Sequence, residues 1–471
     1  MAAAESPPGT FRSGPLLLES SALFTDLYQL TMAAAFFREG LLAPATFSLF
    51  ARRLPPSRGF LVAAGLEDAL EYLGGLRFDT RGLAYLASLG RFEPGFLEYL
   101  AGLRFTGQVR AVPEGTVLGA EAPLLEVTAP IVEAQMVETA LLNLCHVQSV
   151  IASKAARVAI AARGRPVAEF GLRRSHGTDA GLKAARCARL AGCEHTSNVL
   201  AGATWNLPLA GTMAHSFVAA FADELEAFRA YARAFPDAAV LLIDTYDTRE
   251  GARRAARVAA ELAAAGHRLA GVRLDSGNLD ALSRGVRRIL DEAGFPEVPI
   301  LASGGLDEHD IDRLLGAGAP IDAFGIGTRM NVSADAPSLD LVYKLVRFAG
   351  RDVLKLSEGK ETWVGAKQLH RARGDDGRLA GDLLAVAEDA APPGTEPLLE
   401  TVMRDGRLLR PHPPLPALRE RCAAQLAALP EECRRLEDPT PYPVRPSHML
   451  RARQADAAEG LGVPTPPPGH G

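Results

Sequence analysis

From residue 131 to residue 346 the sequence alternates between short apolar stretches and longer segments rich in Ala, Arg and Leu. The apolar stretches are strand-like and read RPVAEFG, AAVLLIDT, LAGVRLDSG, VPILASGG and IDAFGIGT. Segments between them, such as TREGARRAARVAAELAAAG, have a helical pattern. The strands recur every roughly 20–30 residues, which is the size of a βα repeat. This alternation predicts an α/β fold with a parallel sheet or barrel over residues 131–346.

The sequence on either side of this region predicts a second domain. Residues 21–130 begin with a helical pattern and include GQVRAVPEGTVLGAEAPLLEVTAP, which indicates three short strands separated by Pro and Gly. Residues 347–450 return to a strand pattern, and we expect them to rejoin this strand-rich α+β domain. Two domains are expected because 471 residues exceed what one hydrophobic core usually serves. We expect residues 1–20 to be disordered and residues 451–471 to form a Pro-rich flexible tail.

Charge and cysteine content exclude several classes of protein. The formal net charge of −5 gives no reason to expect a nucleic-acid partner. The five cysteines include no CxxC pair, so neither a disulfide framework nor a zinc site is indicated. The first residues lack a secretory signal pattern, and no stretch approaches the roughly 18 consecutive apolar residues of a membrane helix. We therefore expect a cytoplasmic protein with no membrane partner.

Polar and glycine-containing clusters follow the predicted strands. Parallel folds place their active sites at the carboxyl ends of strands. Glycine lets backbone N–H groups approach phosphate oxygens, an arginine fork clamps an anion, and an aromatic ring stacks on a flat ligand. The candidates are Phe170 and Arg173 in EFGLRRSHG, Arg273, Asp275, Ser276 and Gly277 in VRLDSGN, Ser303, Gly304 and Gly305 in ASGGLD, and Gly325, Gly327 and Thr328 in GIGTRM. Together they predict a site for a phosphorylated ligand.

Each cluster taken alone also has a purely structural interpretation. An SGG or GxG sequence is usually a tight turn, and Arg173 and Arg174 would equally suit a solvated face. Asp244 and Asp247 in DTYDT are good residues to cap the next helix. The ligand hypothesis depends on the convergence of several clusters at one end of one sheet. The chain has neither a GxxxxGK[ST] loop nor a GxGxxG motif, so a nucleotide would be bound without those devices.

His215, in GTMAHSFVAAF, stands directly before a long helical pattern. A helix N-terminus gathers backbone N–H donors and positive dipole, which favours a phosphate group. The alternative is a structural histidine held by hydrogen bonds, and this residue alone does not decide between the two.

The order of these motifs resembles the nicotinate phosphoribosyltransferase family. The resemblance runs through TDLYQLTM, FSLFARRLP, EFGLRRSHG, TSNVLAG, GTMAHSF, LIDTYDT, VRLDSGNL, ASGGLDE, GIGTRM and KLSEGKET, over about residues 20–370. The sequence departs from the family's pattern at Val364-Gly365, where a Pro-Gly pair is expected. The resemblance implies an irregular α/β barrel of the type II phosphoribosyltransferase kind, completed by a strand-rich α+β domain in a homodimer.

The family's reaction joins nicotinate to phosphoribosyl pyrophosphate, giving nicotinate mononucleotide and pyrophosphate, with ATP hydrolysis as a drive and Mg²⁺ as cofactor. By this resemblance His215 is the phosphohistidine, and Arg273 and Asp275 join it in catalysis. Phe170 and Tyr28, the latter from the partner subunit, would stack on the pyridine ring, with Arg173 and Arg273 on its carboxylate or the phosphates. The phosphoribosyl group would contact Arg273, Asp275, Ser276, Gly277, Ser303, Gly304, Gly305, Gly325, Gly327 and Thr328. No direct metal ligand is assigned.

Four other functions compete with this one. Nicotinamide-using enzymes of the same fold carry an acid near the amide, where this chain has Ser197 and Asn198. Quinolinate phosphoribosyltransferases have much shorter chains and need no phosphorylatable histidine. A barrel lyase would require a Schiff-base Lys at a strand end, and the clusters contain none. A non-catalytic relative stays possible, although His215, Arg173 and Arg273 are intact.

Overall fold

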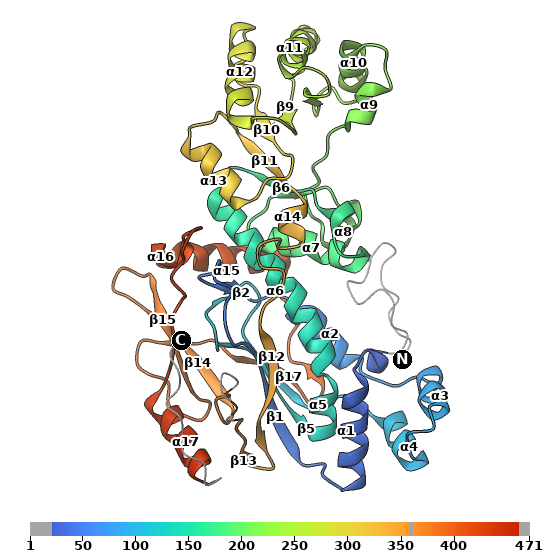
Figure 1. The fold of residues 1–471 in the computed structure, drawn as a ribbon, viewed down its shortest axis with the longest axis vertical. Helices are drawn as coiled ribbons and strands as arrows, with labels where there is room; N and C mark the ends of the chain where they lie inside the picture. The colour runs from blue at the N-terminus through green and yellow to red at the C-terminus, as the bar shows by residue number, and fades with distance from the viewer. Residues whose placement is uncertain (1–20, 356, 358–360, 461–471) are drawn as a thin grey trace. The chain divides into compact units, whose positions relative to one another are not determined.

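The structure is a computed structural model that describes residues 21–355, 357 and 361–460 (Figure 1). The chain divides into two compact units. Unit 1 comprises Lys154–Asp335, and unit 2 comprises residues 21–153 and 336–460 of the described chain. The boundary on the N-terminal side falls inside the long helix α6 (Glu138–Ala161).

Unit 1 is built on one sheet of six parallel strands, in the spatial order β7-β6-β11-β10-β9-β8. The strands are β6 (Val167–Glu169), β7 (His195–Thr196), β8 (Val240–Leu242), β9 (Gly271–Leu274), β10 (Ile300–Ala302) and β11 (Ala323–Ile326). The helices are η2 (Leu172–Arg174), α7 (Thr178–Leu190), α8 (Val199–Trp205), α9 (His215–Ala219), α10 (Glu224–Ala234), α11 (Thr248–Ala264), α12 (Leu279–Glu292), α13 (Glu308–Gly316) and α14 (Thr328–Asn331). The five apolar stretches predicted as strands are therefore all strands.

Local capping starts the helices that follow these strands. The Asp247 carboxylate accepts the Glu250 N–H at the start of α11, and the Asn278 side chain accepts the Ala281 N–H at the start of α12. Such caps satisfy donors that have no partner within the helix. Helix α12 then buries Val286 and Leu290 on one face, which holds it against the neighbouring elements. Each βα connection is thus short, and the polar residues beyond each strand lie in these connections.

Unit 2 contains a seven-stranded antiparallel sheet, in the order β13-β12-β1-β5-β3-β17-β18, and two smaller sheets, β16-β14-β15-β19 and β2-β4. Its strands are β1 (Pro44–Ala51), β2 (Leu61–Val62), β3 (Gln108–Ala111), β4 (Val117–Leu118), β5 (Pro123–Pro130), β12 (Leu341–Phe348), β13 (Arg351–Asp352), β14 (Lys367–Arg373), β15 (Leu379–Val386), β16 (Glu396–Pro397), β17 (Glu400–Arg404), β18 (Arg407–Leu408) and β19 (Val444–Pro446). The central strand β1 pairs with β5 on one side and with β12 on the other. The segment after residue 336 therefore completes the sheet that the N-terminal segment begins.

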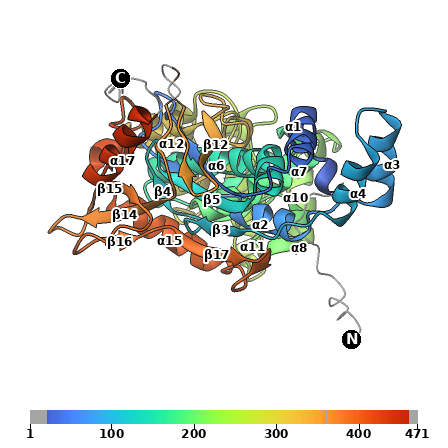
Figure 2. The same ribbon diagram turned by 90° about the horizontal axis from the view of Figure 1, so that it is seen from below.

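The helices of unit 2 are η1 (Ser21–Leu23), α1 (Leu27–Arg38), α2 (Leu66–Gly74), α3 (Thr80–Ser88), α4 (Pro94–Gly102), α5 (Ile131–Met136), the first part of α6, α15 (Leu415–Ala428), α16 (Glu431–Arg434) and α17 (His448–Glu459). Helices α3 and α4 lie side by side (Figure 2). The core of the unit gathers buried residues of strands and helices, among them Leu49, Val127, Val132 and Leu141.

Three parts of the structure differ from the sequence expectations. Unit 1 is shorter than the range 131–346, because α5 and the first part of α6 bury Val132 and Leu141 in the core of unit 2. The long helix predicted after His215 is wrong: α9 ends at Ala219, and α10 begins only at Glu224. Residues 451–459 are not a flexible tail, because they belong to α17, which buries Leu450 and Ala458. Residues 1–20 and 461–471 lie outside the described residues.

Candidate active site

The carboxyl ends of the parallel strands of unit 1 lie along one edge of the sheet. Leu274 at the end of β9 pairs with Ala302 at the end of β10, and Ala302 pairs with Phe324 in β11. On the other side of β11, Ile326 pairs with Glu169 at the end of β6. The four sequence clusters that follow these strands are therefore neighbours at this edge, as the sequence analysis predicted.

Arg273 is the centre of the cluster. Its guanidinium donates from Nε to Ser303 Oγ (2.8 Å), from Nη1 to Thr212 Oγ1 (3.1 Å) and from Nη2 to Asp275 Oδ1 (2.6 Å). The guanidinium carbon lies 5.6 Å from the centroid of the Phe170 ring. This distance is in the range of a cation–π contact. The planar cation is therefore fixed in orientation and lies next to an aromatic face.

The Asp275 carboxylate is held ionised by its neighbours. Burial raises the pKa of Asp275, but the hydrogen bond from Ser303 and the positive charge of Arg273 act in the opposite direction and leave the pKa below its usual range. Ser303 Oγ lies 2.5 Å from Asp275 Oδ1. At neutral pH the site thus holds a carboxylate whose negative charge is shared with one guanidinium.

His215 points toward the same cluster. It is the first residue of α9, follows Ala214 as N-cap, and its side chain is 46 % exposed. Nδ1 lies 3.1 Å from Thr245 Oγ1, and Nε2 lies 3.9 Å from Asp275 Oδ2. The histidine is therefore accessible and next to the acidic group, rather than buried in an apolar interior. A helix of five residues offers only a weak dipole, so α9 does not supply the strong N-terminal field that we expected.

At two positions of the cluster, only glycine fits, because neighbouring atoms lie too close to leave room for a Cβ. A Cβ at Gly304, which has φ +99°, would lie 1.8 Å from the backbone oxygen of Asp275. A Cβ at Gly325 would lie 2.6 Å from the Phe170 ring. These positions exclude any side chain, and they bring the SGG loop against Asp275 and β11 against the aromatic ring. Gly327 is less restricted, because a Cβ there would lie 3.1 Å from the Phe170 backbone oxygen, which is a tight contact but not a collision.

Ser276, Gly277 and Gly305 are exposed beside these residues, and Gly305 has φ +74° with open space around it. Thr328 is the exposed first residue of α14. Arg173 is exposed in η2, and no residue in the described part of the chain pairs with its guanidinium. The structure thus groups most of the predicted residues, and it leaves Arg173 as an available cation on the loop that carries Phe170.

Tyr28 lies in unit 2, on α1, with 48 % of its surface exposed. Burial and the nearby carboxylates of Glu138 and Asp26 raise the pKa of Tyr28 to about 12. The ring therefore carries a neutral hydroxyl at all physiological pH values.

Three residues of the cluster were not predicted as site residues. Thr212 and Thr245 contact Arg273 and His215, as described above. The Asp244 carboxylate accepts from the Asp275 N–H (2.9 Å) and from Ser276 Oγ (2.6 Å) through Oδ2. Its capping interpretation is wrong, because Asp247, not Asp244, caps α11. The signal was present, since DTYDT follows a strand as the other clusters do.

The second oxygen of Asp244, Oδ1, is buried and has no hydrogen-bond partner. A buried carboxylate oxygen without a partner is costly unless a cation or a donor meets it. Three or more metal-ligating side chains do not gather anywhere in the described residues. Mg²⁺ bound with a phosphorylated substrate needs only one or two protein carboxylates, however, so Asp244 and Asp275 fit this ion.

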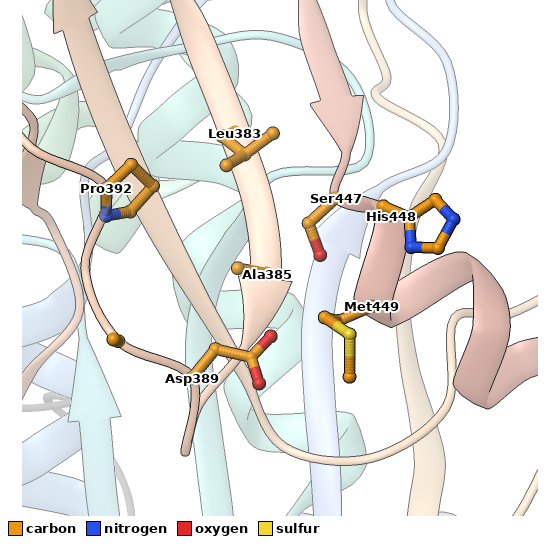
Figure 3. A pocket seen from close by; sticks show the side chains of 8 residues that line it. Leu383, Ala385, Asp389, Pro392, Ser447, His448 and Met449 are labelled. Carbon is orange, nitrogen blue, oxygen red and sulfur yellow. The ribbon is translucent and has the colours of Figure 1, made fainter.

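A separate hollow of about 310 Å³ lies in unit 2 (Figure 3). It is lined by residues of β15, of the loop after β15 and of the start of α17, namely Leu383, Ala385, Asp389, Pro392, Ser447, His448 and Met449. None of the predicted site residues lines it. No described helix is long and apolar enough to cross a membrane.

Comparison with known proteins places this chain in a family. Family models described as the N-terminal and C-terminal domains of nicotinate phosphoribosyltransferase match residues 23–146 and 389–453. A nicotinate phosphoribosyltransferase of Mycobacterium tuberculosis is 49 % identical over 93 % of this chain and 95 % of its own length. The chain belongs to the nicotinate phosphoribosyltransferase family. An enzyme of the same name from Bacillus subtilis is 40 % identical over 90 % of this chain and 93 % of its own.

Solved structures share the fold of this chain. The crystal structure of human nicotinic acid phosphoribosyltransferase superposes with a TM-score of 0.82 at 33 % identity, over 91 % of this chain and 98 % of that one. The nicotinate-nucleotide pyrophosphorylase of Pyrococcus furiosus gives a TM-score of 0.72 at 25 % identity, over 88 % and 97 %. The predicted family and the predicted fold class, an irregular α/β barrel with a second, strand-rich α+β domain, are both confirmed.

Proposed function

We propose that this chain is a nicotinate phosphoribosyltransferase, which forms nicotinate mononucleotide and pyrophosphate from nicotinate and phosphoribosyl pyrophosphate. The observation that carries the proposal is the Arg273–Asp275–Ser303 cluster, packed against Phe170 at a glycine-lined edge of parallel strands. An aromatic face, a fixed cation and open backbone are the groups that a flat acid and a sugar pyrophosphate require. The names of the relatives agree with this choice.

The reaction needs little covalent chemistry from the protein. The pyridine nitrogen forms a bond to ribose C1 as the bond from C1 to the pyrophosphate oxygen breaks, and the pyrophosphate departs with that electron pair. Catalysis is then positioning of the two reactants and neutralisation of the leaving group. We assign Phe170 to stacking on the pyridine ring and Arg173, with its unpaired guanidinium, to the nicotinate carboxylate.

The phosphoribosyl end would lie over the glycine loops. Gly304 exposes its backbone beside the Asp275 backbone, where a side chain would collide, and Gly327 lies close to the Phe170 backbone. Ser276, Gly277, Gly305 and Thr328 are exposed at the same strand ends. We propose that Mg²⁺ binds here with the pyrophosphate, on Asp244 and Asp275, and neutralises negative charge.

We propose that His215 takes the terminal phosphoryl group of ATP, forming an N–P bond as the bond to ADP breaks, and that water later releases it as phosphate. When Nδ1–H donates to Thr245, Nε2 keeps its lone pair for this attack. Asp275 lies 3.9 Å from that nitrogen, so the phosphorylation state of His215 would change the charge beside the sugar-phosphate site. This contact is the physical basis for coupling ATP hydrolysis to synthesis.

We also propose a cytoplasmic homodimer that shares its active sites. Helix α1 exposes three large apolar side chains, Leu27 (45 %), Tyr28 (48 %) and Met32 (38 %). An exposed apolar row of this kind favours a partner surface, and a second copy would bring Tyr28 to the free face of the nicotinate ring. None of the five cysteines, which all lie in the described part of the chain, forms a disulfide, as expected in a reducing compartment.

The test is an assay of the purified protein with phosphoribosyl pyrophosphate and Mg²⁺, with nicotinate and nicotinamide in parallel and with and without ATP. We expect nicotinate mononucleotide, formed faster with ATP, and little or no nicotinamide mononucleotide. A preference for nicotinamide would overturn the substrate assignment. No product from either base would favour a non-catalytic relative.

A further inference from the structure

The four-residue helix α14 lies between two loops of the candidate site. It begins directly after β11, and β11 is flanked in the sheet by β10 on one side and β6 on the other (Figure 1). The SGG loop follows β10, and the loop with Phe170 follows β6. Helix α14 is therefore the one described helix that leaves the sheet between the two loops that we assign to the two substrates.

One side chain of α14 reaches the SGG loop. Arg329 Nη1 lies 2.7 Å from Asp307 Oδ2 and 3.1 Å from Asp310 Oδ2. Asp307 ends that loop, because its other oxygen accepts the N–H groups of His309 and Asp310 and so caps α13. Burial raises the pKa of Asp307, but the backbone hydrogen bond and Arg329 outweigh it and lower the pKa overall. The ion pair thus joins two loop ends that are separated by 22 residues.

Another side chain of α14 reaches the loop with Phe170. The buried Asn331 donates from Nδ2 to Glu169 Oε1 (2.8 Å) and to Ser175 Oγ (3.0 Å). Glu169 is fully buried, and it also accepts the Gly171 N–H (2.5 Å) and the Thr196 hydroxyl (2.6 Å). The hydrogen bonds therefore fix the residues on both sides of Phe170.

The packing around this contact leaves little freedom. A Cβ at Gly171 would lie 2.2 Å from Asn331 Cγ, so the loop backbone lies directly on the amide. A buried carboxylate that loses a hydrogen-bond donor is left partly unsatisfied, which is unfavourable. Loss of the Asn331 side chain would therefore release the turn that carries Phe170 and Arg173.

We infer that Arg329 and Asn331 of α14 are two independent positioning residues. Arg329 fixes the position of the SGG loop, which we assign to phosphoribosyl pyrophosphate, and Asn331 fixes the position of the loop with Phe170, which we assign to nicotinate. This inference rests on the proposed function. Neither side chain needs to touch substrate, because each acts through a residue of the loop that it holds, Asp307 or Glu169.

The test measures KM for each substrate and kcat in Arg329→Met and Asn331→Ala, together with the melting temperature. Arg313→Met is the matched control, because Arg313 also pairs with Asp310 (2.6 Å) but lies on α13 itself and reaches no second loop. We expect Arg329→Met to raise KM for phosphoribosyl pyrophosphate by about three- to tenfold and Asn331→Ala to raise KM for nicotinate by about tenfold. The other KM should change less than about twofold in each variant, and the control should change neither.

The Asp307→Asn variant distinguishes positioning by Arg329 from a direct contact between Arg329 and the substrate phosphate. It keeps a good helix cap on α13 but removes the negative charge that pairs with Arg329. If Arg329 acts through Asp307, Asp307→Asn also raises the KM for phosphoribosyl pyrophosphate. Combining it with Arg329→Met then raises this KM no further than either substitution alone. Additive effects, or equal rises of both KM values in proportion to lost stability, would overturn the inference.

Wild-type turnover tests the proposed function separately. If the wild type does not turn over, calorimetric titration with Mg²⁺–phosphoribosyl pyrophosphate and with nicotinate replaces the KM measurements. Arg329→Met should then bind phosphoribosyl pyrophosphate more weakly, and Asn331→Ala should bind nicotinate more weakly. A wild type that binds neither ligand would overturn the inference together with the function.

Discussion

Gly304 and Gly305 allow a matched test of the geometry of the candidate site. Both residues have left-handed backbone, with φ +99° and φ +74°. Alanine at either position therefore pays the left-handed strain of about 1–2 kcal/mol. The two differ in their surroundings, because a Cβ at Gly305 meets no atom within 4 Å, whereas a Cβ at Gly304 would lie 1.8 Å from the Asp275 backbone oxygen.

The magnitude follows from that distance. Real Cβ atoms essentially never come closer than 3.0 Å, so the loop and the Asp275 backbone must separate by about 1.2 Å in Gly304→Ala. A misplacement of about 1 Å in a reacting site costs roughly 10²-fold in rate, or about 2.7 kcal/mol. We therefore expect kcat/KM for phosphoribosyl pyrophosphate to be about 100-fold lower in Gly304→Ala than in Gly305→Ala.

The assay is formation of nicotinate mononucleotide at saturating nicotinate and varied phosphoribosyl pyrophosphate, with the melting temperature of both variants as a check on folding. The quantity of interest is the ratio of kcat/KM between Gly305→Ala and Gly304→Ala, because the backbone strain that both variants share cancels in it. Values of kcat/KM within about threefold of each other would refute the reasoning, because a backbone collision would then have no effect on the site.

Three further predictions concern the charged cluster. His215→Ala should abolish stimulation by ATP and leave slow ATP-independent synthesis, measured with and without ATP; a mutant that ATP still accelerates would rule out the phosphohistidine. Arg273→Ala should lower kcat/KM roughly 30- to 1000-fold, which corresponds to about 2–4 kcal/mol; Arg268→Ala is the control, because Arg268 is an exposed arginine just before β9 that is not one of the site residues, and it should leave the kinetics near wild type. Ionised Asp275 has a lowered pKa, so activity that needs its charge should persist to low pH and fail only as the pH falls through that pKa. Because the Ser303 hydrogen bond lowers the pKa of Asp275, Ser303→Ala should raise this pKa and move the acidic limb of the kcat/KM–pH profile to higher pH. An acidic limb that does not move would contradict the role of ionised Asp275.

Much of the fold was predictable because its signals are local. The alternation of apolar and helical segments marked all five strands named in advance, since strand and helix periods are written in consecutive residues. The same local reading failed at α9, where the apolar pattern after His215 continues but the helix stops at Ala219. It also failed at residues 451–459, which belong to a helix that buries Leu450 and Ala458.

The sequence by itself determined which residue types follow each strand, and therefore that glycines, arginines and an aromatic ring would meet at one edge. Only the tertiary structure decided which of them touch. The strand order β7-β6-β11-β10-β9-β8 differs from the chain order, so the contacts of Arg273 with Thr212 and of Asn331 with Glu169 join residues 61 and 162 positions apart. Such pairs depend on which strands become neighbours, a choice made by packing of the whole unit rather than by any local pattern.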